Sequence, residues 1–163
     1  MSLATNFKQS TYLGYLAIVR IFVGYHFLSV SIPKLTGSFL DGTTLHEEIL
    51  KNVGRDPFAW HRAFMMDVVI PHPQFFSYLV AFGEAAIGLS LVFGCLVRIS
   101  SSFGAFHNFN ILLAIAAGPQ VGLNRIFIVL QIIFVLSSAG LALGVDGLLK
   151  RRFPSKGVQT LTS

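Results

Sequence analysis

Polar side chains lie inside segments of this chain that are otherwise apolar enough to cross a membrane. Runs of Leu, Ile, Val, Phe, Ala and Gly surround each of Arg20, Glu84, His107, Asn108 and Asn110. An ionisable group in hydrocarbon is costly, so it normally faces a partner, a cavity or a ligand. These five side chains are therefore the first candidates for chemistry.

Arg20 and Glu84 each carry the strong charge well inside their segments. If their helices are antiparallel neighbours, the two depths match when Arg20 reaches toward the midplane. One interpretation is a structural ion pair that holds the helices in register. The other is that the pair lines a cavity, where it binds an acidic or quinone-like head group or passes protons. The residues alone leave both open.

His107 and Asn110 are three positions apart and so share one face of a helix, where Gly104 opens space. Asn108 points roughly 100° away. These groups either hydrogen-bond between helices or hold a quinone carbonyl or a haem iron.

Haem and metal chemistry find weaker support. A second axial ligand would have to be His26, which lies about 120° from Arg20 around the helix, so the two do not share a site. No C-x-x-C-H motif is present. The other histidines, His46, His61 and His72, follow no zinc spacing. The single cysteine, Cys95, excludes a thiol–disulfide enzyme acting alone.

The composition predicts an all-α membrane protein. The chain has 163 residues, of which 53% are hydrophobic and 12% charged, with a mean hydropathy of +0.69. A membrane-spanning helix needs about 20 mostly apolar residues. We expect a single four-helix transmembrane domain over residues 1–153, with spans at 14–32, 75–97, 99–117 and 123–145, and a flexible tail at 154–163.

Between the first two spans, the external segment 33–74 has helix signals of its own. Thr44-Leu45-His46-Glu47 has the form of a capping box, and Asp56-Pro57 reads as an N-cap followed by a proline at the first helical position. We expect two short amphipathic helices lying on the membrane surface, with Trp60 as an interface anchor.

The charges suggest an orientation and a location. The net charge of +5 includes the basic cluster at residues 150–152, directly after the last expected span. Basic residues crowd the span ends on that side, so both termini are expected in the cytoplasm of a multi-pass cell-membrane protein. Without a basic patch interleaved with exposed aromatic residues, nucleic acid is not an expected partner. The expected partners are the lipid bilayer and a second subunit or further copies of this chain.

Several motifs, taken together and in order, resemble the DoxX family of membrane proteins. In chain order they are Arg20-x3-Gly24-x2-Phe27 with Pro33-Lys34-Leu35, Phe82-Gly83-Glu84-x3-Gly88-Leu89-x4-Gly94-x3-Arg98, His107-Asn108-Phe109-Asn110, and Gly144-Val145-Asp146-Gly147-Leu148-Leu149. The last two resemble the DoxD branch, the small subunit of thiosulfate:quinone oxidoreductase. The chain departs from the pattern at Ser31, where a glycine is expected.

The resemblance implies a four-helix bundle in a bacterial or archaeal cytoplasmic membrane, with Gly24, Lys34, Gly88, Arg98 and Asp146 as structural motif positions. It also implies electron transfer from thiosulfate to a membrane quinone, together with a second subunit. On this hypothesis Glu84 and His107 are catalytic, and the ligand-binding residues are Arg20, Asn108 and Asn110. Quinone is the expected cofactor, and no metal site is expected.

Two alternatives come from other functional classes. The chain could be a non-catalytic scaffold or assembly partner for an oxidative-stress or respiratory complex, with its polar residues only holding helices together. A small oligomeric transporter or channel is the third interpretation. Against it, the two halves show no internal repeat and no paired interrupted helices.

Overall fold

The computed structural model describes residues 3–115, 119–137, 139–141 and 143–152, and over this part the chain is helical without strands. The long helices are α1 (Leu3–Thr36), α4 (Pro73–Phe93), α5 (Val97–Ile115) and α6 (Pro119–Leu136). Between α1 and α4 lie η1 (Ser38–Asp41), α2 (Thr43–Asn52), η2 (Val53–Arg55), α3 (Ala59–Phe64) and the π-helical turn η3 (Met65–Val69). A short α7 (Val145–Arg152) follows α6. The tail 154–163, expected to be flexible, lies outside the described residues.

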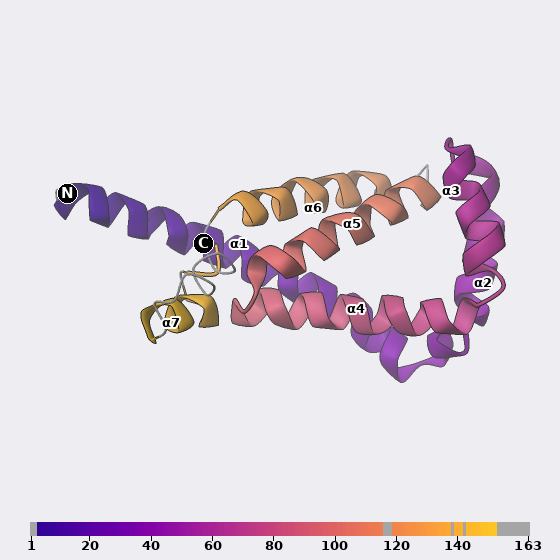
Figure 1. Ribbon diagram of the computed structural model, residues 1–163, viewed down its shortest axis with the longest axis horizontal. Helices are drawn as coiled ribbons and strands as arrows, with labels where there is room; N and C mark the ends of the chain where they lie inside the picture. Colours follow the sequence, from indigo (N-terminus) through magenta and orange to yellow (C-terminus); the bar gives the residue numbers. More distant parts are fainter. Residues whose placement is uncertain (1–2, 116–118, 138, 142, 153–163) are drawn as a thin grey trace.

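The four long helices form an elongated bundle (Figure 1). Helix α1 packs along α4, α5 packs along α6, and α4 contacts α5. The segment with α2 and α3 lies at one end of the bundle, and α7 lies toward the other end, which α1 enters from its N-terminus. The shared core includes Val23 and Phe27 from α1, Leu91 from α4, and Phe134 from α6.

The helix ends differ from those expected at several places. Helix α1 begins at Leu3 and ends at Thr36, whereas the first span was expected at 14–32. Helix α4 ends at Phe93, not at residue 97, because Gly94 adopts the left-handed conformation (φ 66°) that commonly terminates a helix. Helix α6 ends at Leu136, whereas the fourth span was expected to continue to residue 145. In the described part of this stretch, Leu143 also has a positive φ of 49°, and a new helix begins at Val145.

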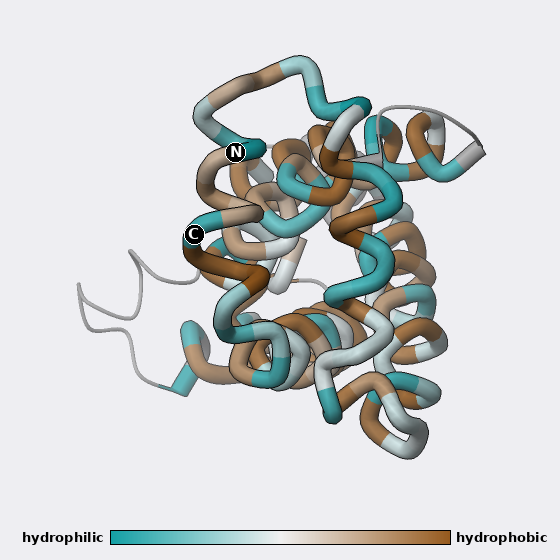
Figure 2. Tube along the Cα trace, turned by 90° about the vertical axis from the view of Figure 1, so that its right-hand side faces the viewer, coloured by the Kyte–Doolittle hydropathy of each residue, from teal (hydrophilic) through white to brown (hydrophobic). Residues whose placement is uncertain are grey.

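The external segment contains the two short helices that the sequence predicts, but their caps differ. The N-cap of α2 is Gly42, not the expected Thr44, and the Thr43 N–H donates to Asp41 Oδ1 at 2.8 Å. The cap before α3 is Phe58, whose N–H donates to Asp56 Oδ1 at 2.9 Å. Asp41 thus acts two residues before the start of α2 and Asp56 three residues before the start of α3, as in Asx turns. Figure 2 shows hydrophilic and hydrophobic residues alternating along this end of the molecule.

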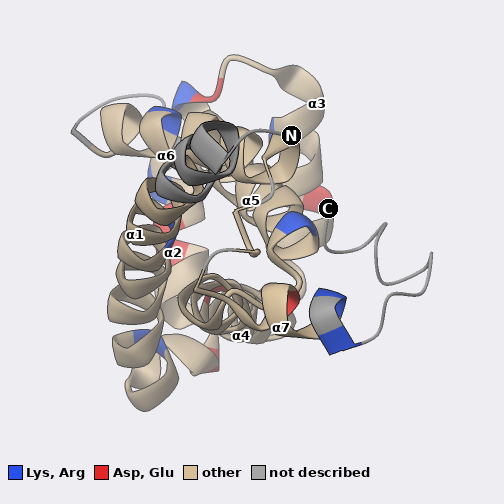
Figure 3. Ribbon diagram, turned by 90° about the vertical axis from the view of Figure 1, so that its left-hand side faces the viewer, with Lys and Arg blue, Asp and Glu red and all other residues tan. Residues whose placement is uncertain are grey.

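Two helical stretches of the described chain are long and apolar enough to cross a membrane: Tyr12–Thr36 and Pro73–Phe93. The stretch Gln120–Leu136 is apolar but shorter. Charged residues are sparse along the long helices, and the short helix α7 carries basic residues (Figure 3). This distribution is typical of a helical protein whose flanks face lipid.

Candidate functional site

Glycines set the register between α1 and α4. A Cβ on Gly24 would lie 2.8 Å from the Val92 backbone nitrogen, and a Cβ on Gly88 would lie 2.8 Å from Leu28 Cγ. Only glycine allows the backbones to approach this closely. In an antiparallel pair of helices, the residue numbers at successive contacts increase along one helix and decrease along the other. Because residues 24 and 28 meet residues 92 and 88, Lys34 comes to lie opposite Glu84.

Glu84 is the centre of a buried charged cluster that joins three helices. Lys34 Nζ on α1 lies 2.7 Å from both carboxylate oxygens, and His107 Nε2 on α5 lies 2.9 Å from Oε1. The Glu84 side chain is 3% exposed, whereas Lys34 is 27% and His107 19% exposed. We call these three residues the Glu84 triad. Its carboxylate is buried inside the bundle, and the Lys34 and His107 side chains remain partly exposed.

Aromatic rings lie beside two members of the triad, Lys34 and His107. The Lys34 ammonium lies 5.1 Å from the centroid of the Phe39 ring, a cation–π distance. The Phe27 ring lies 6.4 Å from His107 and 6.2 Å from Phe127. The Phe39 ring therefore lies beside Lys34, and the Phe27 ring lies beside His107.

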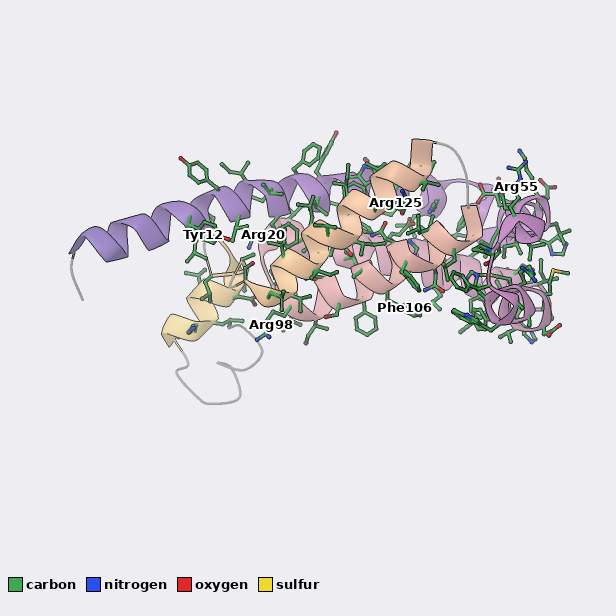
Figure 4. The ribbon with its side chains drawn as sticks, turned by 90° about the horizontal axis from the view of Figure 1, so that it is seen from above. Tyr12, Arg20, Arg55, Arg98, Phe106 and Arg125 are labelled. Carbon is green, nitrogen blue, oxygen red and sulfur yellow. The ribbon has the colours of Figure 1, made fainter. Side chains whose placement is uncertain are left out.

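The predicted Arg20–Glu84 pair is wrong. Arg20 is fully buried, but its guanidinium donates to the backbone carbonyls of Ala139 at 2.9 Å and Leu143 at 3.1 Å. About 21 Å of helix separates Arg20 from Lys34 at 1.5 Å per residue, so Arg20 lies far from the triad along α1. Arg20 fastens the turn after α6 to α1 (Figure 4).

Arg20 and Asp146 hold the chain on either side of α7's start, and we call these two residues with their backbone partners the Arg20–Asp146 cluster. The Asp146 carboxylate accepts hydrogen bonds from the backbone N–H of Leu96 at 2.8 Å and of Val97 at 3.1 Å, at the start of α5. Its own N–H donates to the Gly94 carbonyl at 2.9 Å. Burial, and then the charge of Asp146, raises the pKa of the nearby Cys95 thiol. As a structural motif position, Asp146 therefore acts as both a cap and a tether.

The two asparagines do not join the triad. Asn108 is buried and donates to the Gly104 carbonyl at 2.9 Å, and Asn110 donates to the Phe106 carbonyl at 2.8 Å. Both bonds stay within α5, and neither asparagine bonds Arg20 or a residue of the triad among the described hydrogen bonds. Arg98, expected as a motif position, lies at the start of α5 (Figure 4).

Lys34 is the ion-pair partner of Glu84 that the sequence did not reveal, since it was expected only as a structural motif position. The sequence did contain a signal for this pair, because the glycines at 24 and 88 fix the register between α1 and α4. Gln131 was also missed; it is fully buried against Gly104, with both amide atoms unpartnered among the described residues. A single glutamine inside an apolar helix was the available signal.

A buried Asp56–His61 pair in the external segment was not predicted either. The Asp56 carboxylate bonds His61 Nδ1, and both side chains are buried. The pair ties α3 to the turn before it. No group of three or more His, Cys, Asp or Glu residues that could hold a metal ion occurs in the part of the chain that the structure describes.

Long apolar helices, sparse charges and a carboxylate neutralised inside the bundle together define a helical membrane protein. The family model for DoxX matches residues 15–117, a range that contains both α1–α4 glycine contacts and the Glu84 triad. The chain belongs to the DoxX family of membrane proteins. No curated protein and no solved structure gives a significant match.

Proposed function

We propose that this DoxX protein is a four-span membrane subunit of a redox system and that the Glu84 triad contacts a quinone head group. The four-span topology is supported by the outer faces of α5 and α6. Phe103 and Phe106 on α5 are 65% and 67% exposed, and Val129 on α6 is 56% exposed. Apolar faces of this size need lipid or a protein partner to cover them.

The four-span topology also indicates which end of the bundle faces the cytoplasm. With four spans, the start of α1 and the basic α7 share one end of the bundle, while α2 and α3 lie at the other (Figure 1). Lys and Arg near span ends favour the cytoplasmic side. We therefore place both termini in the cytoplasm and α2 and α3 on the outer surface of a bacterial-type inner membrane.

The observation that carries the quinone proposal is the open side of the triad. Lys34 and His107 each give Glu84 a hydrogen bond, and both remain partly exposed beside aromatic rings. A Lys ammonium has three donors, so Lys34 can hold the carboxylate and still donate to a carbonyl oxygen. The partly exposed His107 ring can pass a proton from solvent to the head group, while Glu84 holds the ring in place.

Quinone reduction consumes both electrons and protons. In this proposal the triad binds the head group and supplies protons, and the electrons come from a donor handled by a partner subunit. Oxidation of thiosulfate, the reaction of the DoxD branch, is the first donor reaction to assay. We assign this chain a binding and protonation role, because the groups of the triad carry protons rather than electrons.

The test is to purify the protein in mild detergent and extract bound quinone for mass spectrometry. Glu84→Gln and His107→Phe should each lower the quinone-to-protein ratio at least about tenfold. His107→Phe removes a group that contacts the head group, and Glu84→Gln removes the charged acceptor that holds Lys34 and His107 in place. Asn110→Ala is the matched control on α5 and should retain quinone. If folded triad variants keep wild-type quinone, the proposal fails.

The scaffold alternative is favoured by one observation: the triad joins α1, α4 and α5 through groups that neutralise one another. A purely structural clamp predicts quinone-free wild-type protein whose triad variants lose stability. The extraction experiment separates the two functions, because only the redox subunit yields stoichiometric quinone from wild-type protein.

A further inference from the structure

A cavity of about 340 Å³ opens near the end of the bundle that carries α2 and α3, and none of the three residues of the Glu84 triad lines it. Arg55 and Pro57 line it from the external segment, and Leu112, Leu113, Val121 and Arg125 line it from α5 and α6. Figure 4 labels both arginines, which come from η2 and α6. Its volume is at the lower end of the range for small-molecule sites.

The charges of this cavity are unbalanced. Both Arg55 and Arg125 are exposed, and neither forms an ion pair with the residues that the structure describes. Among the described residues that line the cavity, none is acidic. Both arginines line the same cavity, and guanidinium groups match phosphate oxygens in bidentate geometry.

The remaining walls are apolar. Leu113 is 6% exposed, and Leu112, Val121 and Pro57 complete a hydrocarbon surface beside the two guanidinium groups. A small inorganic oxyanion would use the arginines and leave these walls unfilled. A ligand with a phosphate at one end and an alkyl chain at the other would use both.

We propose that this cavity binds the phosphate group of an anionic lipid, with Arg55 and Arg125 on the phosphate oxygens and the first part of an acyl chain against Leu112, Leu113 and Val121. This site goes beyond the proposed quinone function and uses none of the triad residues. In the four-span topology it lies near the outer membrane surface, where lipid phosphates are found.

The test is calorimetric titration of the purified protein, in uncharged detergent, with dihexanoyl phosphatidic acid. Dihexanoyl phosphatidylcholine and inorganic phosphate serve as comparison ligands. We expect one phosphatidic acid per chain, bound at least about tenfold more tightly than either comparison ligand. Arg55→Gln and Arg125→Gln should each weaken binding about tenfold, as loss of one charge-assisted bond predicts.

Lys51→Gln is the matched control, because Lys51 is an exposed cation on the neighbouring helix α2 that does not line the cavity. Its affinity should equal that of the wild type. Val121→Glu, which places a negative charge in the cavity wall, should abolish binding without removing either arginine.

Two results would overturn the proposal. Equal affinity for phosphatidylcholine, or no loss in either arginine variant, would show that the cavity does not select an anion. Inorganic phosphate binding as tightly as the lipid, with the same arginine dependence, would show a free oxyanion site and refute the lipid assignment.

Discussion

The ion pair between Lys34 and Glu84 should be measurable as a coupling free energy between the two side chains. The perturbation is a double-mutant cycle of Lys34→Met, Glu84→Gln and the double variant. Exposed ion pairs are worth about 0.2–1 kcal/mol, whereas removing one partner of a fully buried pair costs about 3–5 kcal/mol. Glu84 is 3% and Lys34 27% exposed, so this pair lies between the two limits.

We expect a coupling free energy of about 2 kcal/mol, after discounting for the solvent that reaches Lys34. The assay is reversible unfolding in mixed detergent micelles with increasing sodium dodecyl sulfate, followed by circular dichroism. Each single variant should be destabilised, and the double variant should be less destabilised than the sum of the two, because it leaves no unpaired charge behind.

The matched control is a second cycle of Arg20→Met with Glu84→Gln. These residues share no hydrogen-bond partner among the described residues, and Arg20 bonds Ala139 and Leu143 instead. Distant sites add within about 0.5 kcal/mol. If Arg20 couples to Glu84 by more than this, or Lys34 does not couple to it, the register deduced from Gly24 and Gly88 is refuted.

Three further predictions concern the rest of the bundle. Asp146→Ala should lower the free energy of unfolding by about 1–3 kcal/mol, because two backbone N–H groups at the start of α5 lose their acceptor; an unchanged unfolding midpoint would contradict the cap. Gly24→Leu should lower the free energy of unfolding by at least about 1–3 kcal/mol, because the side chain overpacks against α4. Gly14→Leu is the control and should change it little, since nothing lies within 4 Å of the place that a Cβ on Gly14 would take. Equal losses in the two variants would refute the close contact at Gly24. Because the Cys95 pKa is raised, its thiolate is scarce at pH 7 and iodoacetamide should alkylate it more slowly than in the denatured chain, with the rate still rising above the pH at which a free thiol has fully ionised; equal rates in folded and denatured protein would disprove the shift.

Much of the fold could be predicted from the sequence because its signals are local. Apolar length predicts the long helices, and proline at the first position marks the start of α4 at Pro73. The two short external helices were also predictable from apolar spacing. The ends of α4 and α6 were not, because they depend on Gly94 and on carbonyls that bond Arg20, which lies far away in the sequence.

The site was predictable only in part. Burial cost singles out Glu84 and His107 as residues that need partners, and the structure joins them. Burial cost does not say which cation pairs with Glu84, since Arg20 and Lys34 both lie on α1. Depth within the apolar segment favoured Arg20, but helix register decides in favour of Lys34. Similarly, Asn108 and Asn110 donate hydrogen bonds to carbonyls of their own helix. The residue type alone does not predict this choice of acceptor.

The central claim is that quinone binds at the Glu84 triad, and photolabelling tests it most directly. Membranes containing the protein would be irradiated with an azido-quinone, and the modified peptides mapped by mass spectrometry. We predict labels around Lys34 on α1 and His107 on α5, displaced by excess unlabelled quinone and lost in Glu84→Gln. Labels confined to the Arg20–Asp146 cluster, or labelling that excess quinone does not displace, would contradict it.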